Sequence, residues 1–319
     1  MQQIQQDQHQ AMQTQPVQSQ PQQFQLVPWN PMPNFMVSLA DLYNWLHIPD
    51  VLHPDLQHIL EVRSETVPAP QRACAEQVAR SHLFLEWLRS PESSQLLVHA
   101  NYRKSSPISG LSIFCFYLRK VLASRPDRFI PLVFFCGLHT HEDDDDEEEE
   151  SRDSAAGIQS VPSRWLSIGA HGLIRSFIHQ LLAWYSLHCP AVWITVTALE
   201  KHAIEQNDLG ALYEMFTRLV RMLPSRITVC CLVDGAMYYE RDELAYNMRR
   251  VMLPLSQISD SGPGIAPRPL KVMITSPTNM SDAREWVAEG PTLSLTELGR
   301  PGLVSDEEGL ERMLASALG

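Results

Sequence analysis

Lys104, Ser105 and Asp234 each follow an apolar run, and their side chains are of types that bind phosphate or magnesium. Lys104 and Ser105 come after the run at 95–100, and Asp234 ends the run at 227–233. A lysine reaches phosphate, whereas a serine hydroxyl and a carboxylate can hold Mg²⁺. We therefore expect a nucleotide-binding site at these three residues, with ATP or ADP as the ligand and Asp234 as the Mg²⁺ ligand.

The surrounding residues are poorly suited to tight binding or to hydrolysis. The turn at 100–107 contains no glycine, although only bare backbone lets consecutive N–H groups wrap phosphates. Aligning this turn instead on a helix that begins near Ile108 puts Ser106 and Pro107 where glycine and lysine would lie. Neither alignment places both the glycines and the lysine that bind phosphate, so we expect weak or absent nucleotide binding.

The position of these residues depends on alternating apolar and amphipathic segments after residue 93. The apolar runs predict strands at 95–100, 129–136, 227–233, 270–275 and 292–295. The amphipathic segments predict helices at 108–124, 170–187, 208–222, 240–257 and 304–318. The fold class predicted is α/β, an open parallel sheet of about five strands flanked by helices. The carboxyl ends of its strands would lie along one edge, where ligands bind in such sheets. Cys230 and Cys231, adjacent on one strand, should point to opposite faces.

Two segments have compositions that bury little apolar surface. Thirteen of the first 25 residues are glutamine, so we expect a disordered tail at 1–35, followed by a helical lead-in at 36–92. Residues 142–150 are nine consecutive carboxylates, which predicts a disordered acidic loop at 138–164. His139 and His141 precede the carboxylates and could hold a divalent metal loosely; the alternative is a solvated loop without metal.

The order of these motifs resembles the STAND ATPases, P-loop NTPases of the NACHT type, and most closely the nephrocystin-like domains of fungi. The residues that match are 87–99, 134–137, Leu232–Ala236, which is similar to the Asp-containing Walker B strand, and 270–277, which is similar to the strand that usually ends in Thr-Ser-Arg. The resemblance implies a P-loop NTPase-like domain over 93–319. In the family two carboxylates follow the Asp-Gly-x stretch, but here Met237 and Tyr238 follow, and neither can act as a base near neutral pH.

We therefore expect a non-catalytic domain that acts as a protein-interaction module, without the C-terminal repeat region of its family. The alternative is a slow Mg²⁺-dependent ATPase or a nucleotide-gated signalling switch. A third hypothesis assigns the function to the glutamine-rich tail and the acidic loop, tethered to an inert body.

Charge and hydropathy bear on the partners and the compartment. The nine carboxylates account for all but three units of the net charge of −12, and the 25 Lys and Arg residues form no cluster. We expect no nucleic-acid partner. No apolar run approaches the roughly 20 residues that cross a bilayer, so we expect no membrane partner and a cytoplasmic location.

Overall fold

The computed structural model describes residues 34–46, 48–62, 67–102, 106–140, 167–255, 258, 268–278, 283–286, 290–295 and 307–318. Lys104, Ser105 and His141 lie outside these residues, as do nearly all of the glutamine-rich tail and the acidic segment. Within the described residues, no helix combines the length and apolar character that a membrane crossing requires.

A five-stranded parallel sheet forms the centre of the molecule, which confirms the predicted fold class. The strands lie in the order β3-β5-β6-β2-β7. Their bounds are Ser94–His99 for β2, Phe129–Phe135 for β3, Thr228–Asp234 for β5, Leu270–Ser276 for β6 and Thr292–Ser294 for β7. The three central strands are buried almost throughout because helices cover both faces of the sheet.

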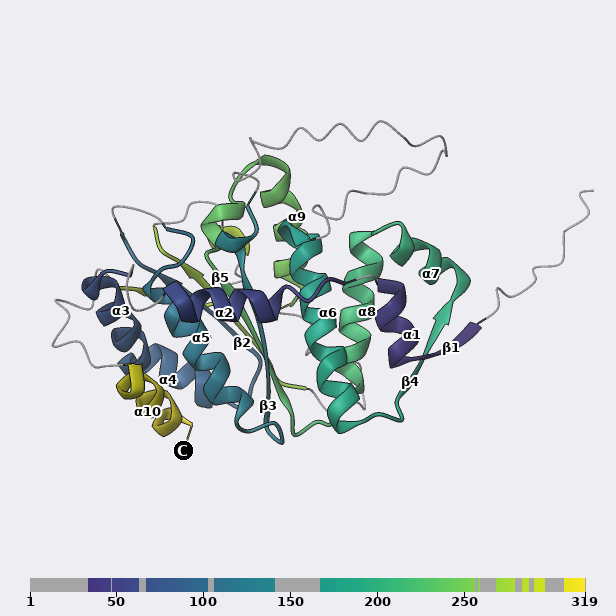
Figure 1. The fold of residues 1–319 in the computed structure, drawn as a ribbon, viewed down its shortest axis with the longest axis horizontal. Helices are drawn as coiled ribbons and strands as arrows, with labels where there is room; N and C mark the ends of the chain where they lie inside the picture. The colour runs from purple at the N-terminus through teal and green to yellow at the C-terminus, as the bar shows by residue number, and fades with distance from the viewer. Residues whose placement is uncertain are drawn as a thin grey trace, which may run out of the picture.

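The helices divide into two layers, one on each face (Figure 1). One layer contains α2 (Leu52–Val62), α3 (Ala69–Arg80), α4 (His82–Arg89), α5 (Gly110–Ala123) and α10 (Glu307–Ala317). The other contains α1 (Leu39–Leu46), α6 (Gly169–His188), α7 (Ala198–Glu205), α8 (Leu209–Met222) and α9 (Asp242–Leu255). Within the helical lead-in predicted at 36–92, the last two helices, α3 and α4, are separate because the chain turns out of the helical conformation at Ser81.

Side chains alternate along the strands between these two layers. Cys231 packs with the α6 layer, whereas Cys230 packs with the α5 layer, as the sequence predicts. All six cysteines are free thiols.

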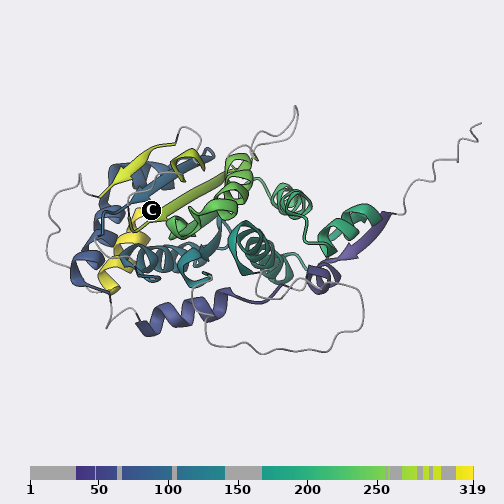
Figure 2. The same ribbon diagram turned by 90° about the horizontal axis from the view of Figure 1, so that it is seen from above.

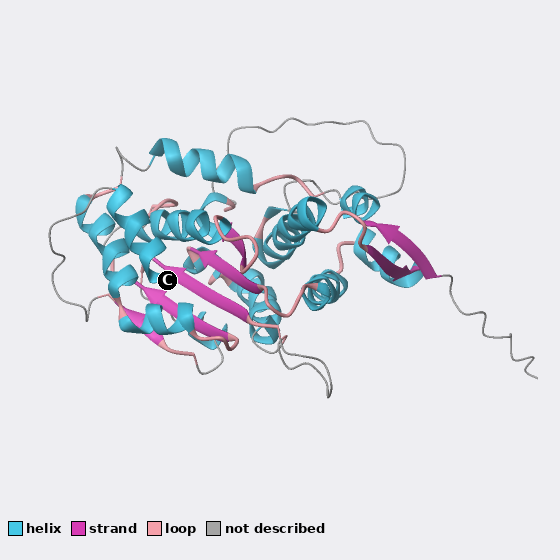
Figure 3. Ribbon diagram, turned by 90° about the horizontal axis from the view of Figure 1, so that it is seen from below, coloured by secondary structure: helices cyan, strands magenta, loops and turns pink. Residues whose placement is uncertain are grey.

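A second, two-stranded sheet was not expected from the sequence. Strand β1 (Asn34–Ser38) pairs antiparallel with β4 (Trp193–Thr197), and Figures 2 and 3 show this ribbon at the far end of the molecule from the parallel sheet. The inward side chains Val37, Ile194 and Val196 are buried in the α6 layer, which anchors the ribbon.

The chain connections define the edge at which a ligand would bind. Strand β2 leads into α5 on one face, while its neighbour β6 leads to Trp286 of the short helix η5 (Ala283–Trp286), whose ring packs on the other face. In open α/β sheets the ligand-binding crevice lies where the connections from two adjacent strands leave to opposite faces of the sheet. The carboxyl ends of β2, β5 and β6 therefore form the first candidate site.

Candidate functional site

Asp234 is the charged group at the centre of this edge. It is the last residue of β5 and is 1% exposed. The hydroxyl group of Thr275, near the end of the adjacent β6, donates a hydrogen bond of 2.5 Å to Asp234 Oδ1. Among the residues that the structure describes, the other carboxylate oxygen, Oδ2, has no hydrogen-bond partner. Oδ2 is thus a buried acceptor without a donor, which costs free energy unless a bound group donates to it or coordinates it.

The environment of Asp234 favours its neutral form. Burial raises the pKa of Asp234 to about 6, although the hydroxyl groups of Ser112 and Thr275 and the backbone of Gly235 favour the charged form. Cys115 lies 4.0 Å from Oδ1, and burial raises the pKa of its thiol well above the ordinary value. The carboxylate is therefore surrounded by neutral donors and no cation lies among the partners described for it.

The N-terminus of α5 faces this carboxylate, but its amide groups are already used. Ser109 is the N-cap, and its hydroxyl oxygen accepts hydrogen bonds from the amides of Leu111, at 3.1 Å, and Ser112, at 3.4 Å. The Ser112 hydroxyl oxygen in turn accepts from the Ser109 amide at 3.0 Å. A helix N-terminus binds phosphate through free N–H groups. Here a capping box satisfies three of them from within the protein.

Helix α3 packs directly against the same helix end. A Cβ atom added to Gly110, the first residue of α5, would lie 2.0 Å from the carbonyl oxygen of Gln71 in α3. The approach leaves no space for a side chain at Gly110, nor for a ligand between these two backbones.

The ends of β3 and β5 are covered in a similar way. Gly235 has φ +71°, a left-handed conformation that turns the chain into the short helix η4 (Ala236–Tyr239). A Cβ atom on Gly137 would lie 2.6 Å from the Pro107 carbonyl oxygen and 2.9 Å from Cε2 of Tyr238. The Tyr238 ring and the Pro107 backbone thus pack over this part of the edge.

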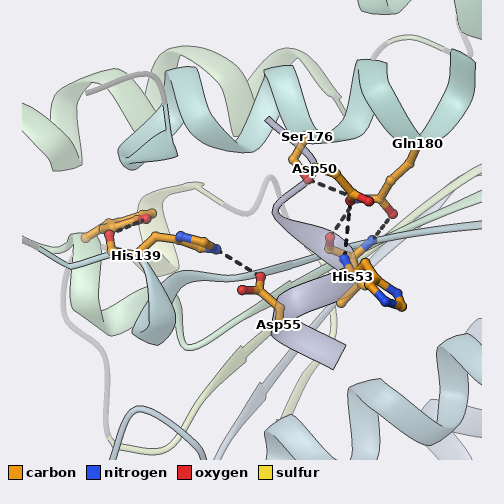
Figure 4. Close-up of polar contacts among 8 residues, drawn as sticks. Asp50, His53, Asp55, His139, Ser176 and Gln180 are labelled. Carbon is orange, nitrogen blue, oxygen red and sulfur yellow. Dashed lines mark hydrogen bonds and ion pairs between the residues drawn. The ribbon is translucent and has the colours of Figure 1, made fainter. Parts of the chain in front are cut away.

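A buried Asp–His pair holds α2 against the edge (Figure 4). His139 Nε2 lies 2.9 Å from Asp55 Oδ2, and the His139 ring stacks on Phe134 with centroids 4.9 Å apart. The Tyr239 hydroxyl group donates to the His139 carbonyl oxygen. Burial raises the pKa of Asp55, and the hydrogen bond with His139 opposes that rise. This network positions His139 immediately before the acidic segment.

Two cavities lie away from the carboxyl ends of the strands. The larger, about 360 Å³, lies between α2, α6 and the start of β3; Asp50, His53 and Gln180, which Figure 4 labels, line it together with Arg119. The Gln180 amide is fixed because it bonds both backbone groups of Val133. The smaller cavity, about 290 Å³, lies at the amino ends of β3, β5 and β6.

The structure places only Asp234 of the three residues expected to bind nucleotide, because Lys104 and Ser105 lie outside the described residues. The groups that approach Asp234 are instead Ser112 and Thr275, which the sequence analysis did not select. The spacing Ser109-x-x-Ser112 is a capping signal that could have identified the helix start. No set of three His, Cys, Asp or Glu side chains within the described residues could hold a metal ion.

A comparison of this chain with protein-family models finds no matching family, and a comparison with curated protein sequences finds no match.

Proposed function

We propose that this chain is a non-catalytic domain of the STAND/NACHT type that acts as a protein-interaction module in the cytoplasm. The observation that supports this most directly is the capping box of α5. The amides of Ser109, Leu111 and Ser112 are bonded to serine hydroxyl groups, so they do not offer the donors that a nucleotide phosphate needs.

The motif alignment that follows from the helix start supports the same proposal. Spacing Gly-x₄-Gly-Lys-Ser/Thr places its second glycine, lysine and hydroxyl residue in the first helical turn. Anchored on α5, that triplet is Gly110-Leu111-Ser112, and the lysine position holds a buried leucine. Met237 and Tyr238 supply no carboxylate beyond Asp234 to position water.

These residues do not fit Mg²⁺–nucleotide well. Asp234 Oδ2 is an oxygen atom that could bind Mg²⁺. The amides that would hold the phosphates are already hydrogen-bonded within the protein, and a leucine occupies the position of the lysine. We therefore derive no catalytic step at this edge.

The β1–β4 ribbon is the surface that we assign to partner binding. Met36 is 63% exposed and Trp193 is 54% exposed, both on its outer face, and Leu199 at the start of α7 is 63% exposed. Among the described residues the ribbon pairs with no third strand, although Arg218 donates a hydrogen bond to the Thr195 carbonyl oxygen. A two-stranded ribbon with exposed aromatic and methionine side chains suits addition of a partner strand. The free thiols are consistent with the reducing cytoplasm.

Thermal unfolding of the full chain with ATP or ADP and Mg²⁺ tests the loss of nucleotide binding. A ligand at 100 times its Kd stabilises by about 2.7 kcal/mol, which a melting curve resolves easily. We expect no magnesium-dependent shift at millimolar nucleotide. A magnesium-dependent rise in Tm would contradict the proposal.

Partner binding is tested by comparing variants in affinity purification from the source cells. The pair Met36→Ser and Trp193→Ser, made together, should release partners that the wild-type chain retains, because both side chains are exposed and their loss does not open the core. Asp234→Ala is the matched control and should keep those partners. Loss of the same partners in both variants would contradict the assignment of partner binding to the β1–β4 ribbon.

A slow Mg²⁺-dependent ATPase or a nucleotide-gated switch is the second candidate function. The unpartnered Oδ2 of Asp234 favours it, because a buried acceptor without a partner is costly to keep. ATP hydrolysis by the purified chain that disappears in both Lys104→Ala and Asp234→Ala would establish this second function. Hydrolysis unaffected by either change would point to a contaminating enzyme.

A further inference from the structure

The smaller cavity lies at the opposite edge of the sheet from Asp234 and has a consistent charge. Four cationic side chains line it, Arg89, Arg128, Arg226 and Lys271, and no aspartate or glutamate is among its lining residues. Outside the nine carboxylates at 142–150 the chain carries a net charge of only −3, and yet every charged residue that lines this cavity is cationic. Clustered cations around a concave site favour an anionic ligand.

Two of the four cations have structural roles that explain their presence. Arg89 Nε donates to the carbonyl oxygen of Ala317 at 3.0 Å, at the end of α10. Lys271, 1% exposed, donates to the carbonyl oxygens of Trp87 and Glu92 and to Ser94 Oγ, at 2.5, 3.1 and 3.3 Å. Cations at helix C-termini offset the helix dipole. These two side chains contribute positive potential to the cavity while most of their donors are used internally.

Arg128 and Arg226 have no such role. Within the described residues neither makes an ion pair, and the one contact of the Arg128 guanidinium group is with the Phe129 ring, 5.4 Å from its centroid. Both are exposed, so no packing requirement accounts for their charge.

The strand register places these two arginines close together. Phe129 pairs with Thr228, and the Thr228 amide donates to the Arg128 carbonyl oxygen at 2.8 Å. Arg128 directly precedes β3 and Arg226 lies two residues before β5. Neighbouring strands are about 4.8 Å apart, so the backbones of Arg128 and Arg226, one residue out of register, lie on neighbouring chains at the same side of the cavity.

We propose that this cavity binds a small anion with one or two phosphate groups, held by Arg128 and Arg226. Planar guanidinium groups donate two parallel hydrogen bonds to phosphate oxygens, and a pair of them matches a phosphate or diphosphate. The Thr228 side chain also lines the cavity and adds a hydroxyl donor. A volume of about 290 Å³ suits a ligand of this size and is at the small end for larger organic ligands. The site is separate from the carboxyl edge and from the ribbon.

The test is isothermal titration calorimetry of the full chain with inorganic pyrophosphate at constant ionic strength. We expect saturable one-to-one binding that weakens at least about tenfold in the double variant Arg128→Gln, Arg226→Gln, because charge-assisted bonds to both groups are lost. The matched control is Arg221→Gln, Arg250→Gln, which removes the same charge from exposed positions in α8 and α9 and should change the affinity less than about twofold.

Three outcomes would overturn the proposal. They are no saturable heat at millimolar pyrophosphate, equal weakening in the control pair, and loss of binding in Asp234→Asn, which would place the anion at the carboxyl edge. A parallel titration with ADP without Mg²⁺ identifies the source of the phosphate. Tighter binding of ADP that the Arg128/Arg226 change removes would indicate a nucleotide, and equal binding would indicate phosphate groups alone.

Discussion

Asp234 at the carboxyl edge of the central sheet and Lys271 at its amino edge are both 1% exposed, but their surroundings differ. At the carboxyl edge, one oxygen of Asp234 has no partner among the described residues, and serine hydroxyls, α3 and Tyr238 close the space around it. At the amino edge, Lys271 donates to three oxygen atoms, while Arg128 and Arg226 remain exposed to solvent. The edge that normally binds ligands in this architecture is thus closed from within, and the opposite edge keeps free charged donors.

The buried charges also respond to pH in opposite directions. Burial raises the pKa of Asp234 to about 6 and lowers the pKa of Lys271 to about 8. For Asp234 the unfolded chain loses its proton first, so stability falls as pH rises from about 4 to about 6. For Lys271 the unfolded chain keeps its proton longer, so stability rises as pH increases from about 8 to about 10.5.

The largest expected effect comes from Gly110→Ala, which would force α3 and α5 apart at the closed edge. The new Cβ atom would lie 2.0 Å from the Gln71 carbonyl oxygen, a backbone atom that cannot move alone. We expect a loss of about 3 kcal/mol in the free energy of unfolding, measured by urea denaturation.

Gly210→Ala is the matched control, since Gly210 is also in the first turn of a helix. Its Cβ atom would meet only the Asp208 carboxylate, at 3.1 Å, and alanine favours helix, so the change should stay within about 1 kcal/mol. Equal stability of the two variants would show that the edge is not closed by this contact.

The next effect is a gain in stability for Asp234→Asn, because the change removes the cost of ionising a buried carboxyl group. A native pKa of about 6 against an ordinary value of 3.8 corresponds to roughly 3 kcal/mol above pH 6. The buried amide would offset part of this, so we expect a gain of about 2 kcal/mol at pH 8.

The pH dependence separates this cause from a packing effect. The gain should shrink as pH falls below 6 and disappear near pH 4, where the native and unfolded carboxyl groups are both protonated. Urea denaturation at a series of pH values measures it. A gain that is constant with pH would mean that the pKa of Asp234 is not raised in the native protein.

The sequence predicted the features that depend on local patterns. Apolar runs gave all five strands of the parallel sheet, and the alternation rule placed Cys230 and Cys231 on opposite faces. No strand was predicted between the helices at 170–187 and 208–222, so the ribbon was missed. Yet the buried residues Ile194 and Val196 alternate with the more exposed residues of 193–197, as in a strand.

The contacts of the site could not be predicted in the same way. Ser112 and Thr275 approach Asp234 from a helix and a strand 122 and 41 residues away in the chain, and Asp55 reaches His139 from a separate helix. Such contacts depend on strand order and helix packing, which no local pattern in a single sequence specifies. The start of α5 was the exception, since Ser109 and Ser112 have the spacing of a capping box.

An effect of similar size and opposite sign is expected for Asp55→Ala, which removes the buried partner of His139. The loss of a hydrogen bond between largely buried groups should lower the free energy of unfolding by about 2 kcal/mol. Asp41→Ala is the control, because Asp41 bonds Ser38 at an exposed helix start. Limited proteolysis gives the second readout, because cleavage near residue 140 should become faster if this pair holds His139 in place. Unchanged cleavage would mean that the Tyr239 hydrogen bond alone holds His139.

The smallest effect concerns the capping box itself and tests what keeps a phosphate out of the carboxyl edge. Ser109→Ala releases the amides of Leu111 and Ser112 and should cost about 1 kcal/mol, similar to Asp208→Ala, which removes the cap of α8. Released amides would be free donors at a helix N-terminus, yet α3 still covers Gly110 and Leu111 still replaces a lysine. We therefore expect that ATP and Mg²⁺ leave the Tm of Ser109→Ala unchanged. If nucleotide stabilises this variant and not the wild-type chain, the serine cap alone keeps the site closed, and one hydroxyl group separates this protein from a nucleotide-binding domain.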